Sequence, residues 1–207
     1  MVRALSTAIR DRRRDRIVRI ATEVFFEDGY GAATMQAISE RLGGSKATLY
    51  AYFKNKEALL EAIIRAQCDG LSAALEQVGA PADLREQLGR LGMAFMSVLV
   101  SEAGVRTMQL AIDASRDSPA LAQRFEDVGV RNITDQLTAF LRDADDRGVL
   151  AAPDPAFAAS IFTTLMRGDL HFRRLLNLMP VPPAEDVRSE VDRAVGLFLT
   201  AFGARGR

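Results

Sequence analysis

Residues 34–60 read TMQAISERLGGSKATLYAYFKNKEALL, with apolar residues returning every three or four positions. This spacing predicts short amphipathic helices, because strands would alternate with a period of two. Thr34 is a suitable amino-terminal cap for a first helix, with Ile38 and Leu42 on its inner face. The Gly-Gly pair that follows Leu42 predicts a tight turn, because glycine adopts backbone conformations that other residues avoid.

A further helix is expected directly after this turn. Ser45 is a good cap for it, and Leu49 and Phe53 fall on one face, four residues apart. Asn55 can cap the next helix, whose inward residues are expected to be Leu59, Leu60, Ile63 and Ile64. An amphipathic helix of about Asp11–Asp28 precedes the pair, with an apolar stripe of Ile17, Ile20, Ala21, Val24 and Phe25. Three helices joined in this way match a helix-turn-helix unit.

The helix that Ser45 caps has the features of a DNA-recognition helix. Its amino-terminal end is exposed if Leu49 points inward, and this end is where recognition helices meet base edges. Lys46 can donate to guanine, Thr48 to either kind of base edge, and the Ala47 methyl can touch a thymine methyl. Contacts to phosphates are expected from Tyr50, Tyr52 and Lys56. A helical hairpin with a solvated basic face is the competing interpretation of this spacing.

The charge distribution favours contact with a polyanion. Residues 1–67 carry 12 basic and 8 acidic side chains, whereas the other 140 residues carry 15 basic and 19 acidic ones. The formal net charge of zero therefore conceals a basic first part and an acidic remainder. All the lysines of the chain lie in the basic part, at Lys46, Lys54 and Lys56. The alternative is that this modest difference in charge between the two parts of the chain arose by chance.

Composition and missing motifs exclude several classes of protein. Apolar residues make up 48% of the 207 residues and charged ones 26%, which is typical of a globular chain. The longest apolar run, Met93–Val100, is too short to cross a bilayer, and no cleavable signal precedes it, so no membrane contact is expected. The single cysteine, Cys68, excludes an internal disulfide and a thiolate zinc cluster, which favours a cytoplasmic protein without a metal. No catalytic or nucleotide-binding motif occurs, so neither an enzyme nor a cofactor is expected.

The remaining sequence also predicts helices, and the expected fold class is all-α. Breaks rich in proline or glycine occur at residues 79–81, 151–155 and 179–183. The expected domains are a helix-turn-helix domain over residues 1–67 and a helical domain over residues 68–207. The helices of the second domain are expected at about Asp83–Val100, Val105–Ala114, Ser118–Arg147, Pro155–Leu178 and Glu185–Phe202.

Residues 34–60 closely resemble the TetR/AcrR family of transcriptional regulators, and the upstream pattern from Ala21 to Tyr30 also fits that family. The resemblance is strong over about residues 13–65, and its motif T-L-Y-x-Y-F-x-N-K-E-x-L-L is highly specific. It implies a helical homodimer with an amino-terminal DNA-binding domain and a carboxy-terminal domain for ligand binding and dimerisation. Most members are repressors that a small molecule releases from an operator. The sequence leaves open whether this chain represses or activates.

The resemblance implies a set of DNA contacts at matching positions. Thr34 and Gln36 match contacts at the start of the first short helix, and Lys56 matches a phosphate-binding lysine. The full set of predicted DNA-binding residues is Thr34, Gln36, Ser45, Lys46, Ala47, Thr48, Tyr50, Tyr52 and Lys56. Gly44 departs from the family, which usually has a valine or similar residue there. This departure keeps open the alternative of a ligand-binding protein without operator binding.

The carboxy-terminal part is expected to bind a small, largely apolar effector. Domains of this layout hold a pocket between their central helices, and Met and Phe suit a pocket that adapts its shape. The candidate lining residues are Met93, Phe95, Met96, Leu99, Met108, Ile112, Phe125, Phe140, Phe162, Met166 and His171. The alternative is an ordinary core position for each apolar residue, and a structural role for the single histidine.

The last two helices are expected to form the dimer surface. Small residues there would permit close helix approach, and they are Ala156, Ala159, Thr163 and Gly168. The apolar face is expected to comprise Val191, Val195, Phe198 and Leu199. Pairing with a second copy gives a symmetric four-helix interface and predicts a palindromic operator in double-stranded DNA.

Arginines crowd the start of the chain, at Arg3, Arg10, Arg12, Arg13 and Arg14. One interpretation is a basic arm that reaches the minor groove or the phosphates of DNA. The other is a solvated tail without a partner, and the sequence alone does not decide between them.

Overall fold

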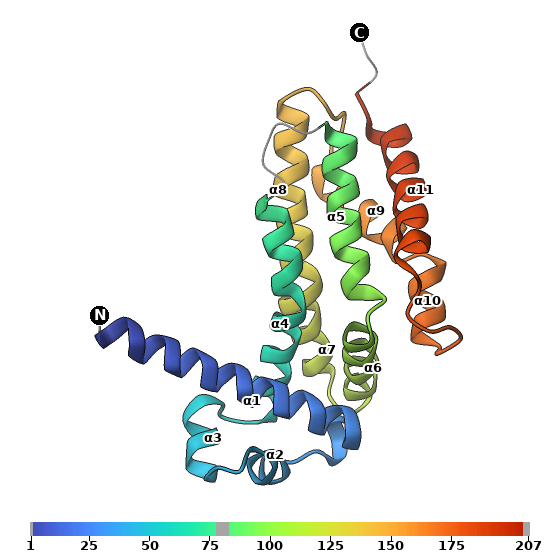
Figure 1. Ribbon diagram of the computed structural model, residues 1–207. Coiled ribbons are helices and arrows are strands. Elements are labelled where there is room, and N and C mark those ends of the chain that lie inside the picture. The colour runs from blue at the N-terminus through green and yellow to red at the C-terminus, as the bar shows by residue number, and fades with distance from the viewer. Residues whose placement is uncertain (1, 78–82, 205–207) are drawn as a thin grey trace. The chain divides into compact units, whose positions relative to one another are not determined.

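A computed structural model describes residues 2–77 and 83–204 (Figure 1). In these ranges the chain is helical nearly throughout and contains no strand beyond one isolated bridge between Leu150 and Gly203. The all-α fold class is therefore confirmed. The helices are α1 Val2–Ala32, α2 Met35–Leu42, α3 Lys46–Tyr52, α4 Lys56–Gln77, α5 Leu84–Leu99, α6 Glu102–Asp117, α7 Pro119–Phe125, the π-helix η1 Glu126–Arg131, α8 Asn132–Asp146, α9 Pro155–Met166, α10 Asp169–Leu175 and α11 Ala184–Phe202.

The chain divides into two compact units. The first holds the chain up to Ala66 together with Thr107–Phe125, and the second holds Gln67–Arg106 together with the chain from Glu126 onward. The boundary inside α4 lies next to the expected limit at residue 67. The grouping of Thr107–Phe125 with the amino-terminal unit is a feature that helical periodicity does not reveal, because periodicity shows which face is buried but not against what. The functional division between residues 1–67 and 68–207 stays a prediction.

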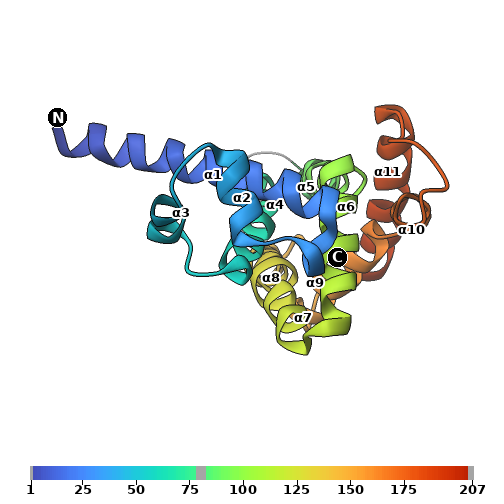
Figure 2. The same ribbon diagram turned by 90° about the horizontal axis from the view of Figure 1, so that it is seen from below.

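The first unit has the core that the sequence predicts. The stripe of α1 is buried, and Ile38, Leu49 and Phe53 are buried with it. Gly29 interrupts α1 near its end with a φ of 76°, a left-handed conformation that glycine adopts at little cost. The expected start of this helix at Asp11 is wrong, because α1 begins at Val2 and its first turns extend beyond α2 and α3 (Figure 2). Residues 2–10 contain neither proline nor glycine, so nothing in them ends a helix.

The second unit is built around a core shared by α5, α8, α9 and α11. Helix α9 packs against both α8 and α11, and α5 packs against α11. Gly92 of α5 permits a close approach, because a Cβ there would lie 2.7 Å from Val191 Cγ1 and 3.1 Å from Met166 Sδ. The helices therefore meet with no room for an added methyl group at this position.

Two of the expected long helices are interrupted. The helix expected over Ser118–Arg147 contains the π-helical segment η1, which inserts a wider turn between α7 and α8. The helix expected over Pro155–Leu178 ends at Met166, and a new helix starts at Asp169 after the irregular backbone of Gly168. The regular spacing of apolar residues continues through both interruptions, so the sequence pattern does not reveal them.

The expected residues of the dimer face are corrected by the structure. The face was predicted from the small and apolar residues of the last two helices, but most of these lie inside the chain's own core. The buried ones are Ala159, Thr163, Val191, Val195 and Phe198, and Leu199 is partly buried. Because helical periodicity marks any buried stripe, it does not distinguish an interface from a core.

In the part of the chain that the structure describes, no single helix is both long and apolar enough to cross a membrane. Among the described helices, only α5 and α6, counted together across the bend between them, reach that length and composition. The same residues contain no group of three or more histidine, cysteine, aspartate or glutamate side chains placed to hold a metal ion.

Candidate nucleic-acid interface

The caps of α2 and α3 fix the geometry of the helix-turn-helix. Thr34 Oγ1 accepts a hydrogen bond of 3.1 Å from the N–H of Ala37, at the start of α2. Gly43 ends α2 in a left-handed conformation with a φ of 67°. Ser45 Oγ then accepts a hydrogen bond of 3.2 Å from the N–H of Thr48, which starts α3. The three predicted start and stop signals are confirmed, and they set the turn between the two helices.

Helix α3 is seated by its inward side chains and offers its other face to solvent. Leu49 is fully buried and Phe53 is nearly so. Lys46 and Ala47 are exposed, and Tyr50 keeps half of its surface accessible. In Figure 2, α3 lies at the edge of the first unit. The amino-terminal half of α3 is therefore free to enter a groove.

A polar bridge joins two of the predicted DNA-binding residues across α2 and α3. Lys46 Nζ donates to Gln36 Oε1 at 3.0 Å, and Gln36 Nε2 donates to Glu40 Oε1 at 2.8 Å. All three side chains are exposed, so this bridge holds the lysine in place without hiding it. Thr48 lies close by, with its hydroxyl oxygen 3.1 Å from that of Ser45. The structure thus brings Gln36, Ser45, Lys46 and Thr48 to one surface.

Lys56, predicted to bind phosphate, is engaged inside the unit. Its ammonium donates to the backbone carbonyls of Tyr30, Gly31 and Ala33 at 2.7, 3.3 and 3.4 Å. It also lies 4.3 Å from the centre of the Tyr30 ring, within the range of a cation–π contact. These contacts use all three ammonium donors and tie α4 to the last turn of α1 and to Ala33, which follows it. A contact between Lys56 and phosphate stays a prediction.

Tyr30, which contacts Lys56 through its ring, is buried against Phe25, with ring centres 5.6 Å apart. Burial raises the pKa of Tyr30 far above its usual range, and the charge of Glu57 raises it further. Tyr30 is therefore un-ionised at neutral pH and acts as a packing residue. Tyr52, predicted to contact phosphate, is half-buried at the end of α3.

The amino-terminal arginines form part of α1 and not a separate arm or tail. The described side chains from Arg10 to Arg16 are exposed, and the side chain of Arg3 lies outside what the structure describes. Arg14 lies over the ring of Phe53, with its guanidinium carbon 5.3 Å from the ring centre. The helix carries these arginines past α2 and α3, and whether they contact DNA stays a prediction.

The residues predicted to line an effector pocket divide between the two units. Met108, Ile112 and Phe125 belong to the first unit, and Ile112 is exposed. The other eight belong to the second unit, where the structure buries Phe95, Met96, Phe162, Met166 and His171. Partly buried positions against the same core are held by Met93, Leu99 and Phe140. Their role in binding an effector stays a prediction.

His171 is buried in the second unit, and burial lowers its pKa below the ordinary value, with Arg167 lowering it further. As the pH falls through about 6.5, the unfolded chain takes up this proton before the folded one. We therefore expect the free energy of unfolding to fall below pH 6.5, by at most about 1.4 kcal/mol per pH unit, until the folded-state pKa is passed.

The measurement is urea unfolding at pH 7.5 and 5.5 for the wild type and His171→Gln at one protomer concentration. The free energy of unfolding should differ less between the two pH values in the variant than in the wild type. An equal difference in both proteins would show that other groups control the acid sensitivity.

Arg174 is a structural residue that the sequence reasoning missed. Its guanidinium is buried and donates to the carbonyl of Val100 at 3.0 Å, to the carbonyl of Met179 at 2.9 Å and to Glu102 Oε2 at 3.0 Å. It thereby joins α10 to the corner between α5 and α6 and to the loop before α11. It lies three residues after His171, which the structure also buries, so the two side chains share one face of α10.

Two family models match the chain. The model of bacterial regulatory proteins of the tetR family matches residues 17–63, which contain α2 and α3. The model of the carboxy-terminal domain of AefR-like transcriptional repressors matches residues 86–204. Together the two matches cover most of both units.

Relatives of known sequence or structure agree with these matches. The regulator YvkB of Bacillus subtilis, an uncharacterised HTH-type transcriptional regulator, is 27% identical over 91% of this chain and 96% of its own length. The flavonoid-responsive regulator FrrA is 32% identical, with a TM-score of 0.75 over 95% of this chain and 100% of that one. The solved complex of SmeT with triclosan is 25% identical, with a TM-score of 0.70 over 94% of this chain and 93% of that one. The chain belongs to the TetR family of DNA-binding transcriptional regulators.

Proposed function

We propose that the chain is a repressor that binds a palindromic operator as a homodimer and is released from it by a small, largely apolar molecule. The observation that carries the DNA-binding part is the seating of α3. Leu49 is buried, whereas Lys46, Ala47 and Tyr50 are exposed to solvent. A helix held in this way can place its amino-terminal side chains against base edges in the major groove.

Repression is favoured over activation by the match of the carboxy-terminal part to AefR-like repressors. In a repressor of this design the effector acts by binding the DNA-bound and free conformations with different affinity, because a ligand with equal affinity would shift nothing. We propose that the two conformations differ in the separation of the two reading helices in the dimer.

The test of operator binding uses the wild-type dimer and a labelled duplex from the DNA upstream of its own gene. Fluorescence anisotropy should show binding that is tighter than to a random duplex of the same length and that weakens steeply with salt. Equal affinity for both duplexes at every salt concentration would contradict the proposal.

An apolar effector suits the interior of the second unit, which is rich in methionine and phenylalanine. Met96, Phe162 and Met166 lie at its centre, and thioether side chains repack easily around a guest. The name of FrrA and the triclosan bound to SmeT support small-molecule control in this family. A panel of such compounds, added to the protein–operator complex, should contain members that lower the anisotropy and raise the melting temperature of the free protein.

The dimer surface is proposed to lie on the outer faces of α9, α10 and α11. Six of the nine large apolar side chains that are exposed in the described residues belong to this region, namely Phe157, Phe172, Leu176, Leu178, Val181 and Leu197. A Cβ added at Gly196, beside Leu197, would meet nothing within 4 Å, so α11 is open there to a neighbouring helix. Apolar patches of this kind commonly mark contacts between proteins.

Replacing Leu197 by glutamate is expected to raise the dissociation constant of the dimer at least about tenfold, because it would bury an unpaired carboxylate in the interface. Sedimentation equilibrium of the purified variant measures this change. Ile112→Glu is the matched control, because Ile112 is also exposed but lies on α6, and it should leave the dimer intact. Unchanged dimerisation in Leu197→Glu would place the interface elsewhere.

A further inference from the structure

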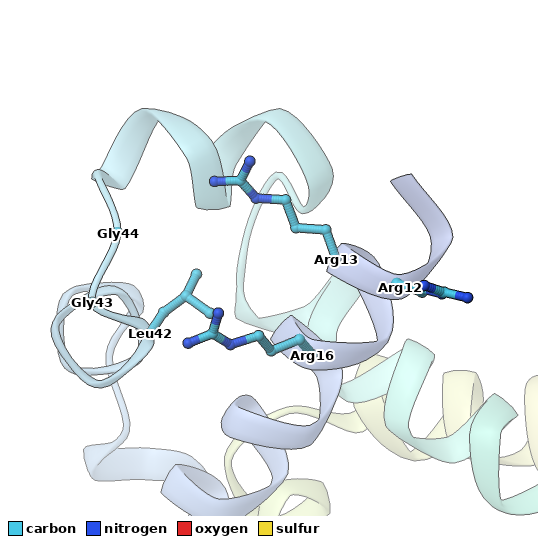
Figure 3. Close-up of a pocket in the computed structure, with 6 residues that line it drawn as sticks. All are labelled: Arg12, Arg13, Arg16, Leu42, Gly43 and Gly44. Atoms are coloured by element: carbon cyan, nitrogen blue, oxygen red, sulfur yellow. The ribbon is translucent and has the colours of Figure 1, made fainter. Parts of the chain in front are cut away.

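A hollow of about 460 Å³ lies in the first unit between α1 and the turn that joins α2 to α3. Three arginines of α1 and the turn residues line it, namely Arg12, Arg13, Arg16, Leu42, Gly43 and Gly44. Figure 3 shows the side chains of Arg13 and Arg16 running from α1 toward the turn, whereas Arg12 points away from it. The guanidinium groups of Arg13 and Arg16 therefore both lie on the side of α1 that faces the turn.

The charges in this hollow have no partner within the described residues. No hydrogen bond, ion pair or ring contact there involves Arg13 or Arg16. Elsewhere in the same unit arginines are paired with glutamates, and these are Arg19, Arg41, Arg65 and Arg124. Two unpaired cations that line one hollow repel each other, and an anion bound in the hollow relieves that repulsion.

Gly44 keeps the hollow open although the backbone does not require a glycine there. Its φ lies outside the left-handed region, and a Cβ at this position would meet only Leu42 side-chain carbons, at 3.8 and 3.9 Å. Gly43 differs, because its φ of 67° favours glycine for conformational reasons. A Cβ at residue 44 therefore fits sterically, and a larger side chain would take up part of the hollow that Gly44 lines.

We propose that this hollow binds a backbone phosphate of the operator DNA, with Arg13 and Arg16 as the donors. This inference rests on the proposed function, because it needs α3 to lie in a groove. Gly44 directly precedes Ser45, the cap of α3, so the hollow lies two residues before the start of the reading helix at Lys46. Phosphates line both edges of the groove that such a helix enters, and the planar guanidinium fork matches two phosphate oxygens.

A phosphate contact of this kind carries no sequence information. It fixes the register of α3 on the duplex, and it contributes equally to operator and random DNA. The contact therefore differs from that of Lys46, which is expected to read a base. The two kinds of contact can be separated by measuring affinity for both duplexes over a range of salt concentrations.

The test replaces both arginines in the full-length protein, as Arg13→Gln with Arg16→Gln, and measures anisotropy with the operator and a random duplex. We expect the affinity for both duplexes to fall by about tenfold, and the slope of log K against log salt to shrink by about one to two. Arg19→Gln is the matched control, because Arg19 lies on the same helix but is paired with Glu23. The Arg19→Gln variant removes one charge and should leave the affinity and the salt slope nearly unchanged.

A second variant, Gly44→Val, fills the hollow without changing any charge. It should weaken binding to both duplexes in the same way, and its melting temperature shows whether the unit remains folded. If operator binding of the wild type is present but both variants keep its affinity and salt slope, the inference is overturned and the proposed function stands. If the wild type binds no duplex, both this inference and the proposed function are overturned.

A free anion is the other possible occupant, and titration with inorganic phosphate in the absence of DNA tests for it. Saturable phosphate binding that needs Arg13 and Arg16, combined with unchanged DNA binding in the variants, would overturn the assignment to operator DNA. Loss of DNA affinity in the variants, with only weak and non-saturable phosphate binding by the wild type, supports it.

Discussion

Lys46→Ala is expected to weaken operator binding by about 10-fold to 100-fold, while binding to a random duplex weakens much less. The lysine is exposed at the start of α3, and Gln36 holds its ammonium at 3.0 Å. A good contact with the correct base is worth about 1–3 kcal/mol of discrimination, which corresponds to that range. Tyr50→Ala should cause a further loss, because Tyr50 is half exposed on the same helix.

The measurement is fluorescence anisotropy at one fixed salt concentration, with the operator and a random duplex for each protein. Arg142→Ala serves as the control, because it removes one exposed positive charge from α8 in the second unit. Dimerisation and effector binding should be unchanged in all three variants. If Lys46→Ala and Tyr50→Ala both keep wild-type affinity for the operator, α3 is not the reading helix.

The second large effect is expected at Arg174, whose replacement by alanine should lower the free energy of unfolding by about 3 kcal/mol. The variant leaves the carbonyls of Val100 and Met179 without their donor, and each buried unsatisfied group costs about 1–3 kcal/mol. Glu102 adds little, because its side chain is mostly exposed and can be solvated again.

Urea unfolding measured at one protomer concentration tests this expectation, since dimerisation contributes to the apparent stability. The neighbouring residue supplies a matched control in Arg173→Ala. Arg173 is exposed and only paired with Asp169 at 3.7 Å, so its loss should change stability by less than about 0.5 kcal/mol. Equal effects of the two substitutions would show that the buried contacts of Arg174 do not stabilise the fold.

The helix-turn-helix could be predicted from the sequence because its signals are local. Thr34, Gly43 and Ser45 each determine the backbone within a few residues, and Leu49 lies one helical turn from Phe53. Local signals of this kind depend on side-chain chemistry and spacing, both of which can be read directly. The family resemblance added the function to a geometry that the residues already implied.

The features that could not be predicted depend on contacts between distant residues. The break at Gly168 interrupts a regular apolar pattern, and Val191 and Phe198 have the same spacing whether they face a core or a partner. The ammonium of Lys56 meets carbonyls more than twenty residues away in the chain. Spacing along the sequence does not encode such partners, so the roles of these residues came only from the structure.

The three lysines differ in their availability to reagents. Lys46 and Lys54 are exposed, whereas the amine of Lys56 is held by three carbonyls beside Tyr30. Amine-coupling chemistry at lysine would thus attach this protein to a sensor chip through the face that we propose to read DNA, and acetylation of Lys46 or Lys54 would neutralise charge on that face. Biosensor work on the operator is better done with the DNA immobilised and the regulator in the flow.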